Sequence, residues 1–349
     1  MIPSSVYLGE LLHLWLEEFP GRGLQLWSNL FDQTLQRWDI PGCNQLLREL
    51  RRLDTETETG LIAYVLHKTG KGTLAAHTGD LETSARIYES VLPVLPKEET
   101  GWVLMNLGNV HYLSRQFDQA LQFYAQAKAV YEKINFLPGL AKVITNMGCI
   151  QRDNGDTDSA LGLFQQAFPL IPDGDIETQI INLSNWANTL HISGNMNEAE
   201  VKYHQALQIW GQVDAPHLQA QITGNLAMLY LDMGYMEQAI DFLSRDLSIQ
   251  YELGDFVSQA EALNNLGIAY RKSGQVDLAL ECYQRSAEIK SSLGDKLGEL
   301  TILRNYIIVA SQQTLPIPKP ILVRAVHLAK EIEDDETLQW LQNISSDFK

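Results

Sequence analysis

A repeat of about 40 residues constrains this chain more than any other feature of its sequence. One asparagine recurs in each copy, and its successive positions differ by 40, 39, 40, 40 and 40 residues. The asparagines are Asn106, Asn146, Asn185, Asn225, Asn265 and Asn305. A fixed period of roughly 20–50 residues is typical of solenoids, in which each unit packs only against its neighbours. The sequence therefore predicts an array of similar units in place of separate globular domains.

Five units are clear, and each has the pattern of two helices joined by a short turn. They lie near residues 98–134, 138–172, 177–212, 217–252 and 257–292. Glycine occupies the turn in four units, because a left-handed backbone there carries no Cβ penalty for glycine; Arg115 replaces it in the first. Small residues in both helices, such as Gly267 and Ala279 in the clearest copy, predict a close approach of the two backbones.

The clearest copy also carries a recognisable motif. Its pattern Asn-Leu-Gly-x-x-Tyr from Asn265, followed by Gly274, Ala279 and Tyr283, resembles the tetratricopeptide repeat (TPR) family, although the usual period is about 34 residues. The longer period and the Leu253-Gly254-Asp255 joint resemble a subgroup with kinesin light chains, Leu-Gly-Asn-repeat adaptors and sensor arrays of bacterial signal-transducing ATPases. The resemblance implies an all-α fold of antiparallel helix pairs in a right-handed superhelical solenoid. It also implies that the first helices line the concave face.

The repeat pattern predicts three parts. Residues 57–333 are expected to form the array of about seven helix pairs, with the first and last pairs divergent. Residues 1–56 lack the repeat, and helices are expected near 4–18, 22–38 and 43–54. We interpret this segment as a cap, since the terminal units of a solenoid expose an apolar face; a separate effector-binding bundle is the alternative.

The C-terminal end departs from the pattern in a predictable way. Pro316, Pro318 and Pro320 stand where the tight turn of the last pair belongs. Proline lacks an N–H donor, so a non-helical link is expected there. Residues 334–349 are expected to form a C-terminal capping helix, with Leu338 and Leu341 turned inward.

The charge and the cysteine content bound the classes of partner. The chain has 26 basic and 43 acidic residues and a net charge of −17. This balance disfavours nucleic acid and anionic membranes, which select basic surfaces. Three dispersed cysteines form no metal motif, and no segment resembles a signal peptide or a spanning helix. We therefore expect a cytoplasmic protein with no metal and no cofactor.

No set of residues has the spacing of a catalytic site. The sequence contains neither G-x-S-x-G nor H-E-x-x-H, and its eight histidines are scattered. The chain is therefore expected not to be an enzyme. An unrecognised activity in residues 1–56 is a remote alternative, because that segment is short for an active-site domain.

The repeated asparagines are the best candidate binding residues. An amide offers both a donor and an acceptor, so one asparagine per unit can follow an extended peptide backbone. In the long-repeat families that this chain resembles, asparagines at this position contact bound peptide. Six residues further along the same helices, Arg152, His191 and Arg271 are expected to contribute to specificity. The structural alternative is that each asparagine bonds within or between helices and only stabilises the fold.

These observations predict a non-catalytic adaptor or scaffold. It would bind a protein or peptide as an extended segment on the concave face. The second hypothesis is a peptide-responsive regulatory sensor, because a helical N-terminus before a repeat array resembles bacterial peptide-pheromone receptors in layout.

Overall fold

The structure, a computed structural model, describes residues 27–32, 34–35, 39–50, 58–211 and 215–347. The helix expected near residues 4–18 lies outside these residues. The chain divides into two compact units, Met1–Pro172 and Asp173–Lys349. In both units the regular secondary structure of the described residues is helical, without a strand. The predicted all-α class is therefore confirmed.

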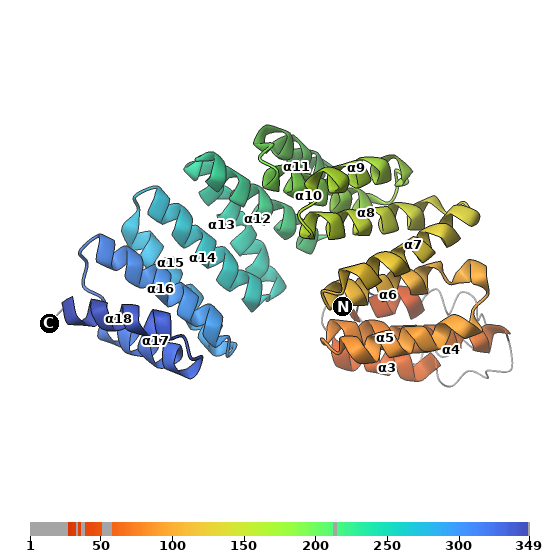
Figure 1. Cartoon of the computed structure of the whole chain (residues 1–349), viewed down its shortest axis with the longest axis horizontal. Helices are drawn as coiled ribbons and strands as arrows, with labels where there is room; N and C mark the ends of the chain where they lie inside the picture. Colours follow the sequence, from red (N-terminus) through yellow and green to blue (C-terminus); the bar gives the residue numbers. More distant parts are fainter. Residues whose placement is uncertain (1–26, 33, 36–38, 51–57, 212–214, 348–349) are drawn as a thin grey trace, which may run out of the picture. The chain divides into compact units, whose positions relative to one another are not determined.

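The first unit consists of helices that pack in consecutive antiparallel pairs (Figure 1). The pair α4–α5 is the divergent first pair expected after residue 57, and α6–α7 and α8–α9 correspond to the units predicted near residues 98–134 and 138–172. The α-helices are α3 (Ile40–Leu50), α4 (Glu58–His77), α5 (Leu81–Val91), α6 (Gly101–Leu113), α7 (Phe117–Lys133), α8 (Leu137–Asp153) and α9 (Thr157–Ala167). The 3-10 helices are η1 (Leu92–Val94), η2 (Lys97–Glu99) and η3 (Phe168–Leu170).

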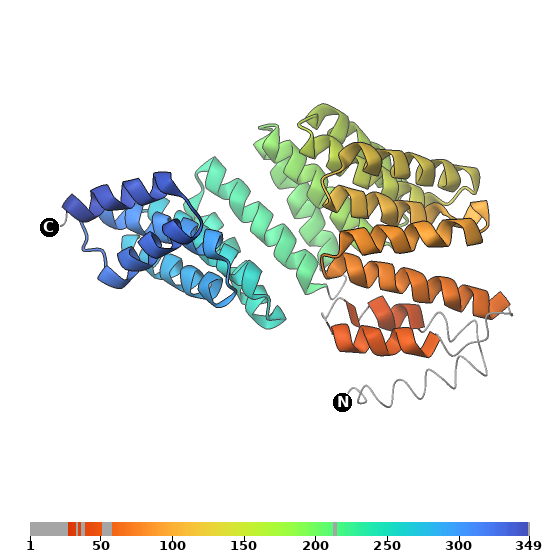
Figure 2. The ribbon, with the colours of Figure 1, turned by 60° about the horizontal axis from the view of Figure 1, so that its bottom comes forward.

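The second unit continues the same architecture (Figure 2). Its consecutive pairs α10–α11, α12–α13 and α14–α15 match the units predicted near residues 177–212, 217–252 and 257–292. The helices are α10 (Ile176–Ile192), α11 (Met196–Trp210), α12 (Pro216–Met233), α13 (Met236–Leu253), α14 (Phe256–Lys272), α15 (Val276–Ser292), α16 (Lys296–Gln312), α17 (Lys319–Glu331) and α18 (Asp335–Asp347).

The turn inside each pair uses left-handed backbone, as predicted. The φ angle is 86° at Gly155, 84° at Gly194 and 80° at Gly274. Arg115 adopts the same conformation with a φ of 60°. Left-handed backbone costs a residue with a Cβ about 1–2 kcal/mol. The strain therefore falls on Arg115 and on Thr314, which has a φ of 55° in the turn between α16 and α17 and stands 40 residues after Gly274.

Inside the pairs, an aromatic ring of the second helix packs on the backbone of the first. Tyr283 is 1% exposed and Phe164 is fully buried. A Cβ added at Gly267 would lie 2.6 Å from the Tyr283 ring, and one added at Gly148 would lie 2.8 Å from the Phe164 ring. Real Cβ atoms do not come this close to their neighbours. The small residue of the first helix thus leaves the space that the aromatic ring of the second helix fills.

The described part of the N-terminal segment packs against the first repeat. Trp27 and Phe31 stack with ring centroids 4.9 Å apart. They share an apolar cluster with Leu47 of α3 and with Ala63 and Leu74 of α4. His67 of α4 bonds through Nδ1 to the Leu47 carbonyl oxygen at 2.8 Å. These contacts favour a cap over a separate bundle.

The C-terminal end closes the second unit with two further helices. No helix spans the residues between Gln312 and Lys319, so Pro316 and Pro318 lie in the predicted non-helical link, whereas Pro320 belongs to the first turn of α17. Leu341 of α18 is fully buried in a cluster with Leu328 of α17 and Ile307 of α16. This is the inward orientation predicted for Leu341. The boundaries 1–56, 57–333 and 334–349 follow the repeat pattern, whereas the compact units divide after Pro172, so the three-part division stays a prediction.

An ion pair also holds the last helix pair to the array. Arg324 of α17 donates to both carboxylate oxygens of Glu299 in α16, at 2.7 Å from Nε and 2.8 Å from Nη2. Glu299 is only 4% exposed. Because a buried carboxylate is costly without a partner, this pairing is a condition for α17 to dock as it does.

Gly267→Val should destabilise the array. The added side chain must displace the Tyr283 ring, and overpacking of this kind costs roughly 1–3 kcal/mol of unfolding free energy. Gly162→Ala is the matched control, because Gly162 lies in α9 with open space around it, and alanine should add about 0.5–1 kcal/mol. Urea unfolding followed by circular dichroism measures both changes. An unchanged midpoint for Gly267→Val would refute the packing role of this glycine.

Arg324→Ala should also lower stability, by about 1–3 kcal/mol, because it leaves the Glu299 carboxylate buried without its donor. Adding Glu299→Gln should restore part of the loss, since an amide is less costly to bury than a charge. Thermal unfolding of both variants at pH 7.5 tests this. A double variant less stable than Arg324→Ala alone would contradict it.

Candidate functional site

All six predicted asparagines lie on the first helices of their pairs, and all six are half-buried. Their helices are α6, α8, α10, α12, α14 and α16. The residues three positions later share the same helical face and are half-buried as well. They are Asn109, Cys149, Asn188, Met228, Ile268 and Ile308. Each first helix therefore presents the predicted stripe partly to solvent.

In the first unit, both asparagines take part in internal hydrogen bonds. Asn146 Nδ2 donates to Asn109 Oδ1 at 2.9 Å, and the Tyr124 hydroxyl donates to the same oxygen at 2.7 Å. Asn109 Nδ2 faces Asn106 Oδ1 at 3.4 Å. This network links α6, α7 and α8. Asn106 and Asn146 thus have the contacts that the structural alternative requires.

Asn185 and Asn305 in the second unit also bond internally. Asn185 Nδ2 donates to the Ile181 carbonyl oxygen one turn earlier, at 2.9 Å. Asn305 Nδ2 donates to Asn264 Oδ1 at 3.1 Å, which joins α16 to α14. The first bond stabilises a single helix, and the second stabilises the stacking of successive units.

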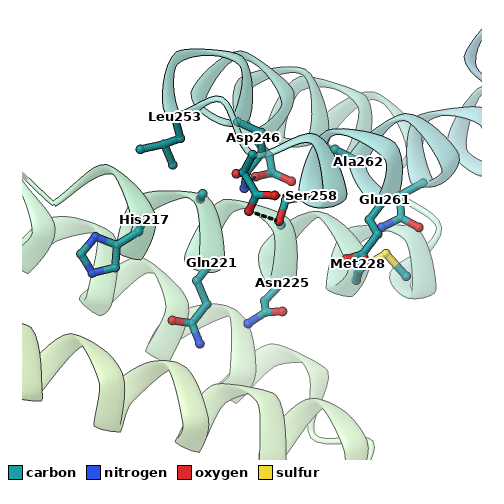
Figure 3. Close-up of a pocket in the computed structure, with 14 residues that line it drawn as sticks. His217, Gln221, Asn225, Met228, Asp246, Leu253, Ser258, Glu261 and Ala262 are labelled. Atoms are coloured by element: carbon teal, nitrogen blue, oxygen red, sulfur yellow. Dashed lines mark hydrogen bonds between the residues drawn. The ribbon is translucent and has the colours of Figure 1, made fainter. Parts of the chain in front are cut away.

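Asn225 and Asn265 differ from the other four. Across the described residues, neither amide makes a hydrogen bond. Both line a pocket of about 330 Å³ between α12, α13 and α14, which we call the α12–α14 pocket (Figure 3). Asn225 also lines a pocket with α10 and α11, and Asn265 lines one with α15 and α16. These two asparagines are therefore available to a ligand.

The three specificity residues predicted from spacing are in different environments. Arg152 contacts the adjacent Asp153 at 2.9 Å, and its side chain is 12% exposed. His191 Nε2 lies 2.9 Å from the Asp232 carboxylate, which ties α10 to α12. Arg271 is exposed at the end of α14. Their role in specificity stays a prediction, and only Arg271 has its charge open to solvent.

The most unusual residue of the α12–α14 pocket is Asp246 of α13, which is not among the residues predicted from the repeat. It is 8% exposed, and Gln250 Nε2 donates to its Oδ1 at 3.0 Å. The pKa of Asp246 is raised to about 6, chiefly by burial; the Gln250 hydrogen bond opposes this shift, and the nearby Glu261 and Asp255 carboxylates add to it. The equivalent positions in three other units hold buried alanines, Ala127, Ala167 and Ala206. That contrast within the repeat was the sequence signal for this residue.

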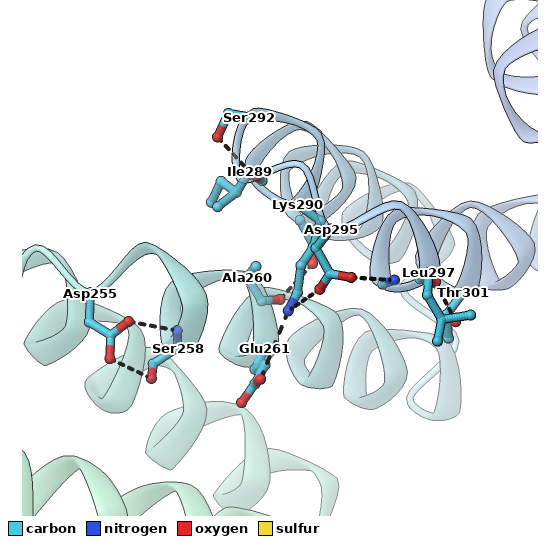
Figure 4. A network of polar contacts seen from close by, with 12 residues as sticks. Asp255, Ser258, Ala260, Glu261, Ile289, Lys290, Ser292, Asp295, Leu297 and Thr301 are labelled. Carbon is cyan, nitrogen blue, oxygen red and sulfur yellow. Dashed lines mark hydrogen bonds and ion pairs between the residues drawn. The ribbon is translucent and has the colours of Figure 1, made fainter. Parts of the chain in front are cut away.

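A second pocket, which we call the α14–α16 pocket, lies one repeat further along (Figure 4). Its volume is about 510 Å³. Lys290 of α15 is 9% exposed, and its Nζ lies 3.0 Å from Asp295 Oδ2 and 3.9 Å from Glu261 Oε1. The Gly298 N–H and the Lys290 ammonium hold the pKa of Asp295 below its usual range. The acidic groups of this pocket are therefore neutralised from within the chain.

The described residues contain no group of three or more histidine, cysteine, aspartate or glutamate side chains that could hold a metal ion. Among the same residues, none of the helices has both the length and the apolar character needed to cross a membrane. The chemistry that the site offers is hydrogen bonding by amides together with negative charge.

Family models for the tetratricopeptide repeat match this chain over most of the described repeats. One model matches residues 99–173 and 178–251, and another matches residues 260–293. Together these spans make up more than half of the chain. A comparison with curated proteins found no match.

Solved structures show the same fold at low sequence identity. A signal transduction ATPase with a tetratricopeptide repeat sensor from Pyrococcus horikoshii has a TM-score of 0.68 at 14% identity, over 97% of this chain and 50% of that one. A Rap protein complexed with competence and sporulation factor has a TM-score of 0.60 at 13% identity, over 97% of each chain. PilW, a type IV pilus biogenesis factor, has a TM-score of 0.54 at 17% identity, over 69% of this chain and 98% of that one. With its repeat matched by the family models and its helix pairs by these structures, this chain belongs to the tetratricopeptide repeat family.

Proposed function

We propose that this protein is a non-catalytic adaptor that binds an extended peptide segment along α12 and α14. Tetratricopeptide repeat proteins generally mediate interactions between proteins, and their fold is typical of adaptors without enzymatic activity. The observation that carries the proposal is the pair Asn225 and Asn265. These amides occupy equivalent positions, make no hydrogen bond within the described chain and line the same pocket.

Half-buried amides without partners have a physical reason to bind a ligand. An asparagine that loses water without gaining a hydrogen bond destabilises its surroundings, so such groups are rare unless water or a partner satisfies them. A peptide in extended conformation presents N–H and C=O groups in regular alternation. Each amide can both donate and accept, so it can pair with such a backbone without selecting its side chains.

The residues beside Asn225 and Asn265 indicate which side chains the bound peptide would have. Met228 and Ile268 lie three positions after Asn225 and Asn265 and are half-buried on the same face. Gln221 and Glu261 lie one turn before the asparagines and are exposed. A peptide that follows this face therefore meets apolar and polar positions in turn. We infer that the bound segment has both apolar and polar side chains. We further propose that the protein is cytoplasmic, needs no cofactor, and has neither nucleic acid nor membrane as a partner.

The likeness to the Rap protein favours a second candidate function. That structure is a complex with competence and sporulation factor, and the match covers 97% of each chain. This second hypothesis is a peptide-responsive regulatory sensor, in which the array changes shape when a peptide binds and the change is the signal. The adaptor hypothesis requires no change of shape.

Asn225→Ala with Asn265→Ala should weaken peptide binding about 5- to 150-fold, since two amides would lose net hydrogen bonds of about 0.5–1.5 kcal/mol each. The probe is a library of acetylated, amidated decapeptides passed over immobilised full-length protein. Peptides retained by the wild type are resynthesised, and their affinities are measured by fluorescence anisotropy.

The matched control is Asn146→Ala with Asn305→Ala, which removes the same chemical groups where they bond internally. It should lower the unfolding midpoint and leave peptide affinity within about twofold, because these amides have partners already. If the control weakens binding as much as Asn225→Ala with Asn265→Ala, the proposed site is wrong.

Small-angle scattering separates the two readings of the bound state. The adaptor predicts the same radius of gyration with and without a retained peptide. A decrease of several per cent on saturation would instead assign the sensor function, because compaction is the response that the sensor requires.

A further inference from the structure

The α12–α14 and α14–α16 pockets occupy equivalent places in successive repeats. Each is bounded by two first helices and by the second helix between them. A step of 40 residues takes Asn225 to Asn265, Gln250 to Lys290 and Asp255 to Asp295. The two pockets can therefore be compared position by position.

The α14–α16 pocket contains its own cation. Lys290 is nine-tenths buried, and its ammonium group lies between Asp295 and Glu261 (Figure 4). A buried lysine is stable only when carboxylates or other acceptors surround it. This pocket thus shows which chemical group the geometry of such a site accommodates.

The α12–α14 pocket has the acidic groups but lacks the cation. Neither lysine nor arginine is among the described residues that line it, and Gln250 stands in place of Lys290. Its negative groups are Asp246, Asp255 and Glu261, and the one basic side chain in its lining is the exposed His217 of α12. Asp255 caps α14 by accepting from the Ser258 N–H at 3.1 Å, which leaves Asp246 as the buried charge of the pocket.

Asp246 is incompletely satisfied. Its Oδ1 accepts from Gln250, whereas its Oδ2 makes no hydrogen bond within the part of the chain that the structure describes. Oδ2 lies on the side of Gly224, at 3.3 Å from the place that a Cβ would take there. Burial of more than nine-tenths of the residue removes water from the carboxylate and destabilises its charged form. A positively charged ligand would offset this cost through a charge-assisted hydrogen bond to the free oxygen.

We propose that the α12–α14 pocket binds the guanidinium or ammonium group of an arginine or lysine in the bound peptide. The inference rests on the proposed function, because Asn225 and Asn265 on either side of the pocket would hold the peptide backbone. The volume of about 330 Å³ is at the low end of the roughly 300–1,000 Å³ of ligand pockets, which suits one side chain. The net charge of −17 attracts a basic segment from a distance.

Asp246→Asn tests the proposal. The change keeps the size of the side chain and its acceptor for Gln250, and it removes the charge. The probe is an acetylated, amidated peptide library with one fixed central residue, which is arginine, lysine, glutamine or glutamate. The wild type should retain the arginine and lysine pools preferentially, and Asp246→Asn should lose this preference with a drop of about tenfold in affinity for a basic peptide, as expected for one charge-assisted hydrogen bond.

The matched control is Asp241→Asn, which removes an exposed charge from the same helix. Asp241 pairs with Arg245 at 2.8 Å and does not line the pocket. It should leave the basic preference unchanged. Equal losses in both variants would mean that net charge alone attracts the peptides, and this would overturn the proposal.

The outcomes separate this inference from the proposed function. Peptides retained without a basic preference, or with a preference that survives Asp246→Asn, overturn the cation pocket and leave the adaptor function standing. No retained peptide in any pool contradicts the adaptor function and the cation pocket together. Spermidine that binds the wild type as tightly as the basic peptides, and loses affinity with Asp246→Asn, would assign the pocket to a free polyamine instead.

The pH dependence of the protein's stability distinguishes a ligand-binding role of Asp246 from a purely structural one. Because the pKa of Asp246 is raised from 3.8 to about 6, the folded state binds more protons than the unfolded state between these values, and stability falls as pH rises through that window. The groups that act on it are Gln250 on its own helix and Asp255 and Glu261 at α14, and His217 of α12 lines the same pocket. Asp246→Asn should therefore raise the melting temperature at pH 7.5, and the gain should shrink towards pH 4. A lower melting temperature at pH 7.5 would identify Asp246 as a structural residue and contradict the proposal.

Discussion

The contact between an aromatic ring and the backbone of the partner helix is the interaction on which the rest of the structure depends. At Gly267, no side chain separates the α14 backbone from the Tyr283 ring. This contact sets how closely two helices of a pair approach, and hence the step from one pair to the next. The equivalent position is Ala227 in the pair where Leu243 replaces the ring. The spacing of every side chain on the first helices follows from these contacts.

Given that spacing, successive first helices come close enough for side chains to bond across the repeat. The Tyr112 hydroxyl donates to Asp153 at 2.6 Å between α6 and α8. Two repeats later along the chain, His191 Nε2 lies 2.9 Å from Asp232 Oδ2 between α10 and α12. Asn305 and Asn146 make analogous ties. A polar residue on this face can therefore serve the fold or a ligand. Asn225 and Asn265 are the repeated asparagines that the fold does not use.

Much of the fold could be predicted from the sequence, because the repeat encodes it in every copy. The glycine of each turn, the small residue under each ring and the proline link all have the conformations that their chemistry requires. The role of individual asparagines could not be predicted in this way. Asn146 and Asn265 occupy the same repeat position, and only the neighbours in space distinguish them. Asn109 of the preceding first helix accepts from Asn146, whereas Met228 holds the corresponding position for Asn265. Asp246 could not be predicted from the repeat either, because it departs from it: three other units have a buried alanine at the equivalent position.

We propose that Asn225 and Asn265 bind the backbone of an extended peptide, while the other repeated asparagines stabilise the fold. Side-chain amide resonances of the full chain, labelled with 15N at asparagine, report this directly. On addition of a retained peptide, the Asn225 and Asn265 signals should shift and their amide protons should exchange more slowly with water, whereas those of Asn146 and Asn305 should stay in place. Shifts confined to Asn146 and Asn305, or no shift of any asparagine at saturation with peptide, would contradict the binding of the peptide backbone by Asn225 and Asn265.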